Sequence, residues 1–523
     1  MIQNITPRKY QKEIVETCKK KSCLVVLPTG IGKTLIALML TTDILEKNPK
    51  SKILFLAPTR PLAQQHLNYF TKHLPELYAD MQLFTGKIDS EKRKKIWQTA
   101  DIIFSTPQCI SNDLKNNLYN LSEVSLLVED ECHRCVKNYS YTYVAQKYKE
   151  QSDNFHVLGL TASPGADKKS IKKICENLNI EDVELRTRES DDVKEYLQEL
   201  EIQTIKLDFP KEFLEIYSMI QRIYQTKVDE LKKRNLLFGP ANKVTLLKAQ
   251  ATIMKAISSG NKNFNLLLGA SACALAIKLQ HLSELLETQT LETTNEYIKE
   301  LFKQAEQKKS KAVQRLAKMP EFNLASIKLN NLISNNIEHP KLIVLKDLVE
   351  TEYENNNKTK LIIFAQFRNT ISQIANYLNK IKGINAKVFV GQAKKIIHKK
   401  ESGLNQKQQQ EIIKEFSEGK INVLCATSIA EEGLDIPEVN SVVFYEPIPS
   451  AIRSIQRRGR TARLIKGKLI MLITKKTRDE AYYWSAFHKE KRMHSAIDSI
   501  KKEFQNGTFK TNKNSDINQQ TLD

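Results

Sequence analysis

A chain of 523 residues is long enough for about three domains of ordinary size. Its hydrophobic fraction of 41% and aromatic fraction of 7% are typical of globular proteins and exclude wholesale disorder. Lysine and arginine outnumber aspartate and glutamate by 81 to 60, and the resulting net charge of +21 favours a polyanionic partner such as nucleic acid. A generally lysine-rich proteome is the alternative explanation of this excess.

Targeting and membrane-spanning signals are not evident in the sequence. Residues 1–11 are polar and lack the apolar core of a signal peptide, and no apolar run approaches the roughly 20 residues of a membrane span. The eight cysteines are scattered, and Cys132 and Cys135 have no second pair at zinc-site spacing. We therefore expect a cytoplasmic protein, nucleoid-associated if prokaryotic, with reduced thiols and no membrane partner.

The first part of the chain alternates short apolar runs with longer amphipathic stretches such as Thr34–Leu45. Buried strands that alternate with helices predict a parallel, doubly wound α/β sheet. We assign residues 1–208 to this first lobe. The runs predicted as strands are Cys23–Pro28, Ile53–Pro58, Asp101–Thr106, Val124–Glu129 and Val157–Thr161.

Helical periodicity dominates residues 209–340, where Pro and Gly are sparse and strand-like runs vanish. We assign this region to an inserted helical domain. Lys308, Lys311, Arg315 and Lys318 are spaced three and four apart, which on one helix would place them on a single face. That face is either merely solvated or a groove that contacts phosphates.

Short apolar runs resume after the insert and predict a second α/β lobe over residues 341–490. The remaining residues, 491–523, are predicted to be a tail that is partly disordered, because the last of them are polar and rich in Asn, Lys and Thr. The strand-like runs of the second lobe are Leu361–Ala365, Ala386–Val390, Val423–Ala426, Ser441–Tyr445 and Leu469–Ile473.

A phosphate-binding loop is predicted at Pro28–Thr34, which follows an apolar run and opens a helix. Its two glycines let backbone amides point at phosphate oxygens, and the start of the helix adds a positive dipole end. Lys33 would hold the β and γ phosphates of ATP, and Thr34 would bind Mg²⁺. Leu27 stands where the complete motif has a glycine, so the motif is incomplete by the strict rule.

Two adjacent carboxylates, Asp130 and Glu131, end another apolar run. Asp130 can reach Mg²⁺, usually through water, and Glu131 can position and deprotonate the attacking water. Burying such a pair without a metal would be costly, which disfavours a purely structural role. Thr161–Ser163 follows the next run and either links the acidic site to nucleic acid or forms an ordinary turn.

Four arginines fall within the eight residues Gln456–Arg463. Arg460 and Arg463 are three apart, so on a helix they would point the same way and could act as arginine fingers from the second lobe. A nucleic-acid patch is the competing interpretation for Arg457 and Arg458.

Taken in order, these motifs resemble those of superfamily 2 helicases, and the resemblance covers residues 1 to about 490. It is strongest to the helicase part of archaeal Hef and to the Fanconi anaemia M-type DNA translocases, with RIG-I-like receptors and Dicer helicase domains as near neighbours. The further segments that carry it are Pro7–Gln11, Pro58–Arg60, Ser105–Pro107, Leu285–Gln289, Ile362–Arg368, Ala426–Asp435 and Thr477–Trp484.

The resemblance implies two RecA-like lobes that close on ATP and Mg²⁺ and reopen after hydrolysis, with His133 coupling the ATP site to the second lobe near Gln456. It implies a catalytic set made of Lys33, Asp130, Glu131, His133, Gln456, Arg460 and Arg463. The residues that it places on the nucleotide are Arg8, Gln11, Thr29, Gly30, Gly32, Lys33, Thr34, Gly433 and Asp435. Those that it places along the nucleic acid are Arg60, Thr106, Gln366, Arg368 and Thr427.

The implied function is an ATP-dependent DNA helicase or translocase that acts on branched DNA, such as forks and junctions, in repair or replication-fork processing. The alternative is a duplex-RNA-dependent ATPase of the RIG-I or Dicer type. Cys132 stands where Hef usually has Ala, and the spelling Asp-Glu-Cys-His is shared with RNA-sensing relatives. Ala462 is a second departure, because Gly is common there.

Two other classes are less favoured. A non-catalytic nucleic-acid scaffold does not need the intact Lys33, Asp130, Glu131 and Arg463, and a P-loop transporter ATPase would need a membrane segment or an ABC-type signature. Hef also carries a C-terminal nuclease with a Glu-Arg-Lys core and a helix-hairpin-helix module, and nothing after Glu490 matches either. We therefore expect a helicase portion only, with a separate nuclease partner as an open question.

Overall fold

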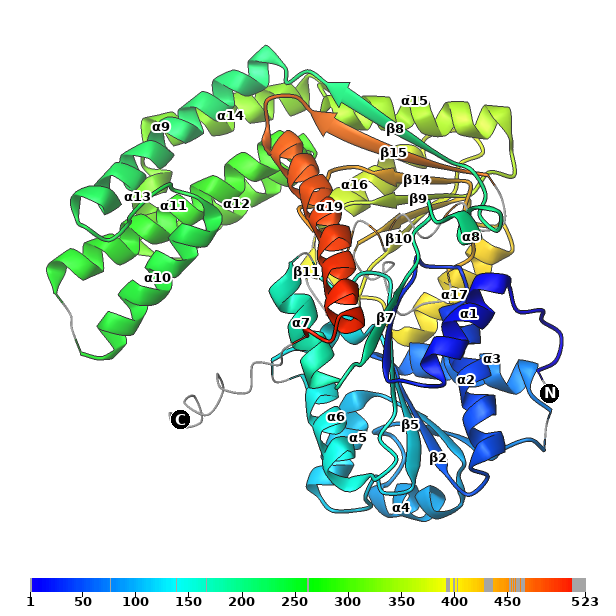
Figure 1. Ribbon diagram of the computed structural model, residues 1–523. Coiled ribbons are helices and arrows are strands. Elements are labelled where there is room, and N and C mark those ends of the chain that lie inside the picture. The colour runs from blue at the N-terminus through cyan, green and yellow to red at the C-terminus, as the bar shows by residue number, and fades with distance from the viewer. Residues whose placement is uncertain are drawn as a thin grey trace.

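The computed structural model places two α/β lobes one above the other, with a helical arm projecting from the upper lobe (Figure 1). Each lobe is built on a parallel sheet, as the alternation of apolar runs and helices predicted. The structure describes residues 2–509 except 76, 138, 166, 261–262, 392–395, 398–399, 402, 428–435, 451–452, 454, 456, 458–460 and 462–465.

The first lobe has a seven-stranded sheet in the order β3-β4-β2-β5-β6-β1-β7, and all of these strands run parallel. The five predicted strands are confirmed, whereas the two outermost were missed because edge strands carry polar side chains and lack a continuous apolar run. The strands are β1 (Cys23–Val26), β2 (Lys52–Leu56), β3 (Met81–Phe84), β4 (Ile102–Ser105), β5 (Val124–Asp130), β6 (Val157–Thr161) and β7 (Asp182–Leu185).

Helices cover both faces of this sheet, so its central strands are buried on both sides. Alternate residues of β1 show this, since Leu24 packs into one apolar cluster and Val25 into the other. The helices are α1 (Lys9–Cys18), α2 (Lys33–Lys47), α3 (Arg60–His73), α4 (Ser90–Thr99), α5 (Pro107–Lys115), α6 (Ser140–Gln151), α7 (Lys168–Asn177) and α8 (Asp191–Lys194), with a 3-10 turn at Cys132–Arg134.

The second lobe has a six-stranded parallel sheet in the order β10-β13-β9-β14-β15-β8. Its five predicted strands are confirmed. The strands are β8 (Leu200–Leu207), β9 (Leu361–Phe364), β10 (Ala386–Phe389), β13 (Val423–Ala426), β14 (Ser441–Phe444) and β15 (Gly467–Thr474), with a two-stranded ribbon β11 (Ile396–Ile397) and β12 (Lys400–Glu401) beside them. The helices are α15 (Pro340–Asn355), α16 (Arg368–Leu378) and α17 (Gln406–Ser417).

One predicted domain boundary is wrong in the structure. Residues 200–207 were assigned with 1–208 to the first lobe, but they form β8, which pairs with β15 over eight consecutive residues of the second sheet. The side chains of β8 are exposed or half-buried, so its sequence has no apolar run that would mark a strand. The helical domain is therefore inserted within the second lobe, after its first strand, rather than between two complete lobes.

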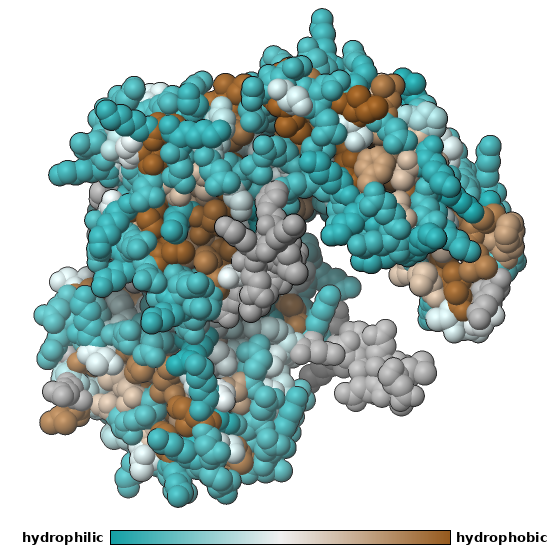
Figure 2. Space-filling model, turned by 180° about the vertical axis from the view of Figure 1, so that it is seen from behind, coloured by the Kyte–Doolittle hydropathy of each residue, from teal (hydrophilic) through white to brown (hydrophobic). Residues whose placement is uncertain are grey.

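The helical domain forms the arm, and its long helix α11 packs against four of the other five helices. By length and composition α11 could span a membrane, but its apolar residues from Ala272 to Leu286 pack into the core of the arm, whereas Phe264 and Leu267 near its start are exposed. Figure 2 shows apolar surface at the free end of the arm. The helices are α9 (Lys211–Lys233), α10 (Lys243–Ser258), α11 (Phe264–Thr288), α12 (Leu291–Glu306), α13 (Lys311–Ala317) and α14 (Pro320–Ser334).

The predicted basic face of this domain is also corrected. The residue Lys308 lies in the turn between α12 and α13 with a φ of 53°, so it is not on the same helix as Lys311 and Arg315. Lys318 follows the end of α13. The left-handed backbone of this turn separates Lys308 from the other three, whereas Lys311 and Arg315 remain on one helix whose C-cap is Lys318.

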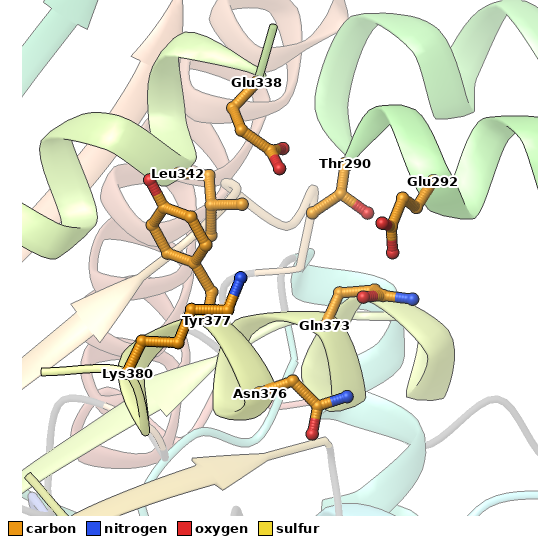
Figure 3. Close-up of a pocket in the computed structure, with 8 residues that line it drawn as sticks. All are labelled: Thr290, Glu292, Glu338, Leu342, Gln373, Asn376, Tyr377 and Lys380. Atoms are coloured by element: carbon orange, nitrogen blue, oxygen red, sulfur yellow. The ribbon is translucent and has the colours of Figure 1, made fainter. Parts of the chain in front are cut away.

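A small cavity of about 50 Å³ marks the junction of the arm with the second lobe (Figure 3). Glu338 and Glu292 approach it from the starts of α15 and α12, while polar side chains of α16 close the opposite side. Burial raises the pKa of Glu338, and the negative charge of Glu292 adds to the effect. The cavity has room for one or a few water molecules, which identifies it as a packing junction rather than a ligand pocket.

The last helix, α19 (Arg478–Gln505), leaves the second lobe and returns to the first (Figure 1). Met493, Ile497 and Ile500 enter the apolar core of the first lobe. The predicted end of the second lobe at residue 490 and the predicted tail from 491 are therefore wrong up to Gln505, because apolar residues at helical spacing are hidden among polar ones. Residues 510–523 of that tail lie outside the described residues.

Candidate nucleotide-binding site

The loop between β1 and α2 has the geometry of a phosphate cradle. Gly30 and Gly32 take φ angles of 84° and 88°, and α2 begins at Lys33. A β-carbon on Gly32 would lie 2.2 Å from Gln11 Nε2 and would displace that amide, and the positive φ by itself favours glycine there. Lys33 Nζ donates to the carbonyl of Leu27 at 3.3 Å, which folds the ammonium back over the loop. The helix start and this ammonium together fit the phosphates of a nucleotide.

Two side chains of α1 hold this loop from below. Tyr10 donates its hydroxyl to the carbonyl of Ile31 at 2.5 Å, and Gln11 Nε2 donates to the same carbonyl at 3.2 Å. Gln11 Oε1 accepts from the Arg8 backbone N–H at 2.8 Å, so both ends of its amide are engaged. Reading of adenine by Gln11 stays a prediction, and it would require these bonds to be exchanged.

One polar group of the loop lacks a partner within the described part of the chain. The buried hydroxyl oxygen of Thr29 has no hydrogen bond to any described residue. A buried polar atom without a partner costs stability unless a ligand or water completes it. Thr29 also lines a cavity of about 520 Å³ that extends from the loop to Arg186 and Met493. The loop thus has an open polar position beside a ligand-sized space.

Asp130, at the end of β5, is buried and held on two sides. His66 Nε2, from α3, lies 2.9 Å from Asp130 Oδ2, and Tyr141 donates its hydroxyl to the Asp130 carbonyl at 2.6 Å. Burial by itself raises the pKa of the Asp130 carboxyl, but His66 and Lys33 more than offset it and the pKa lies below its ordinary value. A carboxylate that stays ionised when buried suits a divalent cation.

Glu131 has a left-handed backbone, with φ 52° and ψ 44°. That conformation costs on the order of 1–3 kcal/mol for a residue with a side chain, and such outliers concentrate at functional sites. Its carboxylate lies 3.2 Å from His133 Nδ1, which in turn lies 3.1 Å from Thr161 Oγ1. Thr161 Oγ1 also accepts from the Ser163 backbone N–H at 3.1 Å. The acidic pair and the turn after β6 are therefore joined in one network.

The sheet order explains why these segments meet. Strands β5, β6 and β1 are neighbours and run parallel, so the residues after each strand lie at the same edge. The edge where parallel strands end is where ligands bind in doubly wound sheets.

The residues present fit Mg²⁺ bound together with a nucleotide. Asp130 and Thr34 offer the hard oxygen donors that Mg²⁺ prefers. Within the described ranges, no group of three or more His, Cys, Asp or Glu side chains could hold a metal ion. Mg²⁺ is commonly bound by one or two protein oxygens together with substrate phosphates, so this sparse donor set agrees with a phosphate-bridged ion.

The residues predicted to follow the nucleic acid lie just beyond strand ends. Arg60 follows β2 and Thr106 follows β4 in the first lobe, while Thr427 follows β13 in the second. Gln366 and Arg368 follow β9. The Gln366 backbone N–H donates to the Glu446 carboxylate, and Arg368 Nη2 donates to the Gly391 carbonyl at 3.1 Å. Their role along nucleic acid stays a prediction.

Arg457 is described, and it is fully buried with its guanidinium 4.8 Å from the ring centre of Phe364 and 5.6 Å from that of Phe444. The interpretation of Arg457 as part of a nucleic-acid patch is therefore wrong, because its charge is stacked inside the lobe. The residues that lie outside the described part are Gly433, Asp435, Gln456, Arg458, Arg460 and Arg463.

The sequence did not point to His66 or Tyr141. His66 is 64 positions from Asp130, and no motif or spacing links a single histidine on a helix to a distant carboxylate. The helix α3 follows β2, the strand beside β5, and only this sheet order brings His66 to the site.

Comparisons with known proteins agree with this architecture. Family models match in three parts: the type III restriction enzyme res subunit at residues 4–166, the helical bundle of an ATP-dependent RNA helicase at 212–334, and the helicase conserved C-terminal domain at 340–465.

Individual relatives cover nearly the whole chain. A protein of Methanocaldococcus jannaschii named as an ATP-dependent RNA helicase is 40% identical over 94% of this chain and 60% of its own length. The ATP-dependent DNA helicase fml1 of Schizosaccharomyces pombe is 30% identical over 90% of this chain and 57% of its own length. The chain thus spans little more than half of these relatives.

A solved structure matches more completely. The crystal structure of the Pyrococcus furiosus Hef helicase domain is 41% identical, with a TM-score of 0.70 over 92% of this chain and 98% of that one. The resemblance drawn from the motifs is confirmed, and the chain belongs to the superfamily 2 helicases, in the family of the Hef helicase domain.

Proposed function

We propose that this chain is an ATP-dependent DNA helicase or translocase that acts on branched DNA in repair or replication-fork processing. The observation that supports it most is the meeting of the Lys33 loop with Asp130 and Glu131 at one sheet edge, in a chain 41% identical to the Hef helicase domain. The fungal relatives named as ATP-dependent DNA helicases favour DNA. The net charge of +21 favours a polyanion.

In this proposal the first lobe holds and hydrolyses ATP. Lys33 and the amides of the loop bind the phosphates. Thr34 and Asp130 hold Mg²⁺, which would neutralise the negative charge that develops on the phosphates during hydrolysis. Glu131 orients the attacking water and accepts its proton. Glu131 contacts His133, and His133 contacts Thr161. Through these contacts the loss of the γ-phosphate would change the conformation of residues outside the nucleotide site.

The second lobe would complete the site when the lobes close on the nucleotide. We assign Arg460 and Arg463 to charge stabilisation in the transition state and Gln456 to the contact with His133. Gly433 and Asp435 would touch the nucleotide from this side. The predicted nucleic-acid track would bind phosphates with little sequence preference and strong dependence on salt. Its residues are Arg60, Thr106, Gln366, Arg368 and Thr427.

The helical arm would clamp the duplex part of a fork or junction. A cytoplasmic location, nucleoid-associated if the protein is prokaryotic, and cooperation with a nuclease on another chain belong to the same proposal.

ATP hydrolysis should be measured without nucleic acid and with single-stranded DNA, forked DNA or duplex RNA. The strongest stimulation is expected from forked DNA, and Lys33→Ala should abolish hydrolysis under every condition. Full activity of Lys33→Ala would refute the assigned site.

A duplex-RNA-dependent ATPase is the second candidate. It is favoured by the helical-bundle match to an RNA helicase model and by the name of the Methanocaldococcus jannaschii relative. The same motor would serve both substrates, so only the nucleic acid separates them. This candidate would be supported if duplex RNA stimulated ATP hydrolysis more than forked DNA did and also displaced forked DNA in a binding competition.

A further inference from the structure

Helix α19 is anchored at its two ends to different parts of the molecule. Near its start, Arg478 Nη1 donates to the Gln280 carbonyl at 2.8 Å and Tyr482 donates to Glu284 Oε1 at 3.2 Å, both on α11 of the arm. Near its end, the Lys168 ammonium of the first lobe lies 2.5 Å from the Glu503 carboxylate. The middle of the helix therefore runs between the arm and the first lobe (Figure 1).

Aromatic side chains lie exposed on this middle section. Trp484 and Phe487 are each 49% exposed, whereas Trp97, the other tryptophan of the chain, is buried at 5% and stacked 3.9 Å from Tyr119. The ring centre of Trp484 lies 5.8 Å from that of Phe487 and 6.0 Å from that of His488. These contacts orient the rings relative to one another, yet leave about half of the Trp484 and Phe487 surfaces open.

Basic side chains continue the same face. Lys491 and Arg492 are seven and eight residues after Trp484, so they lie on its side of the helix, and both are exposed. Among the described residues neither makes an ion pair, and the Arg492 Nε donates only to the His488 carbonyl, at 3.3 Å. We call the residues Trp484, Phe487, His488, Lys491 and Arg492 the α19 face.

Aromatic rings beside positive charges match the chemistry of a single nucleic-acid strand. Each base stacked on an aromatic side chain contributes about 1–3 kcal/mol without regard to sequence, and the cations bind the backbone phosphates. A face of this kind beside a duplex-holding arm would meet bases that have lost their partners. An apolar protein interface would instead favour fewer charged residues at its centre.

The α19 face is also connected to the nucleotide site. The Ser163 hydroxyl donates to the Met493 sulfur at 2.9 Å, and Ser163 belongs to the network of Thr161 and His133. Met493 follows Trp484 by nine residues, or about 14 Å along the helix. A strand held on this face would therefore be in mechanical contact with the hydrolysis site through one rigid helix.

We propose that the α19 face stacks unpaired bases of the DNA strand that passes between the helical arm and the first lobe. The inference rests on the proposed function and adds the place where separated bases are held. Trp484 stacks a base, and Phe487 and His488 support the Trp484 ring. Lys491 and Arg492 bind the phosphates on either side of that base.

The two tryptophans allow a direct test. In a Trp97→Phe variant, the fluorescence of the full chain comes from Trp484 alone, and titration with oligo-dT should quench it in a saturable way, whereas blunt duplex DNA should not. Should Trp97→Phe fail to fold, the difference between the quenching of the native chain and of Trp484→Phe carries the same information. Oligo-rU compared with oligo-dU, which differ only in the 2′-hydroxyl, shows whether the face distinguishes the two sugars.

Affinity supplies the second readout. Trp484→Ala with Phe487→Ala should weaken binding of labelled oligo-dT by about 5- to 160-fold, from the loss of one stacked base, and Trp484→Phe should restore most of it. Ile202→Ala, which alters an apolar side chain 59% exposed on β8, should leave binding unchanged. Unchanged Trp484 fluorescence while labelled DNA binds would overturn the inference. A changed oligomeric state with unchanged DNA affinity would overturn it too, since the face would then contact protein.

The inference and the proposed function fail in different ways. A chain that quenches on oligo-dT but never hydrolyses ATP would refute the motor and keep the α19 face. A chain with DNA-stimulated hydrolysis and silent Trp484 would keep the motor and refute the face. In Lys33→Ala, hydrolysis should be lost and the quenching by oligo-dT should remain.

Discussion

At the scale of single residues, the most informative contact is the one between His66 and Asp130. In the proposed site Asp130 would bind Mg²⁺, and the histidine fixes the orientation of its carboxylate; loss of such a partner typically lowers metal affinity or activity by about 10- to 100-fold. We expect His66→Ala to lower ATP turnover in that range and to raise the Mg²⁺ concentration needed for half-maximal activity, while His66→Gln, which keeps a donor, recovers part of the loss. ATPase assays across a Mg²⁺ series measure both.

His73 provides the matched control for this variant. It lies on the same helix, is buried, and its Nδ1 lies 2.9 Å from the Gln3 carbonyl rather than from the acidic site. His73→Ala should therefore affect stability without changing the Mg²⁺ requirement. Equal Mg²⁺ requirements for the two variants would show that His66 supports only the helix.

Gly32 gives a second residue-scale prediction, because it combines a positive φ with the close approach of Gln11. Gly32→Ala strains the backbone and displaces the Gln11 amide, so we expect the KM for ATP to rise at least 10-fold. Gly239 has a φ of 78° and nothing within 4 Å of an added β-carbon, so Gly239→Ala imposes the backbone strain alone. Because Gly239 lies in the helical arm, its variant should keep the native KM for ATP, and ATP saturation curves that match for the two variants would refute the role of Gly32 in the nucleotide loop.

How far the site could be predicted depends on whether its parts are local in sequence. The Lys33 loop and the pair Asp130 and Glu131 could be proposed from the sequence because each is a short motif after a buried strand. His66 was missed because its partner is defined by strand order, which no local pattern encodes. Arg457 was misjudged because a run of arginines in the sequence does not show which of them is buried, and Arg457 lies inside the lobe against Phe364 and Phe444.

At the scale of elements, helix α15 begins with a buried histidine that must stay neutral. His339 Nδ1 accepts from the Lys341 backbone N–H at 3.2 Å, as the N-terminal cap of α15. Burial, and then the charge of Lys341, lower the pKa of His339 to about 3. Below pH 6.5, the ordinary pKa of histidine, His339 takes up a proton in the unfolded chain but not in the folded chain. Stability is therefore lost as pH falls from about 6.5 toward 3, by up to about 1.4 kcal/mol per pH unit.

His339→Asn removes this titration and keeps a capping oxygen. The free energy of unfolding of the native chain should fall relative to the variant between pH 6.5 and 4, with no change in their difference between pH 7 and 8. Urea unfolding at several pH values, followed by circular dichroism, measures this difference. A constant difference across the acid range would show that His339 is protonated in the folded protein.

The elements that were predicted and those that were missed differ in burial. Central strands such as β1 and β9 are buried throughout and read as apolar runs. The strands β3, β7 and β8 lie at sheet edges with half-exposed or polar side chains, so only backbone pairing defines them. Because β8 has no apolar run, it was not recognised as the first strand of the second lobe, and the end of the first lobe was therefore predicted too late, at residue 208.

At the scale of the whole molecule, α19 ties the second lobe, the arm and the first lobe together, and a fully buried ion pair holds its start. The Lys341 ammonium of α15 contacts the Asp479 carboxylate of α19, and it also donates to the Thr288 carbonyl at the end of α11 at 3.3 Å. Asp479 further accepts from the Thr474 backbone N–H at 2.9 Å. Three separate parts of the molecule therefore meet at one ammonium group.

A double-mutant cycle tests this junction. Asp479→Asn keeps the shape and an acceptor for Thr474 but leaves the Lys341 charge buried and unpaired, which should cost about 3–5 kcal/mol of the free energy of unfolding. Lys341→Met leaves Asp479 unpaired and should cost a similar amount. The double variant should be more stable than the sum of the two losses predicts, because no charge is then left unpaired. Additive losses in thermal and urea unfolding would show that the two charges do not act as a pair, and α19 would then be held by its apolar contacts with the first lobe alone.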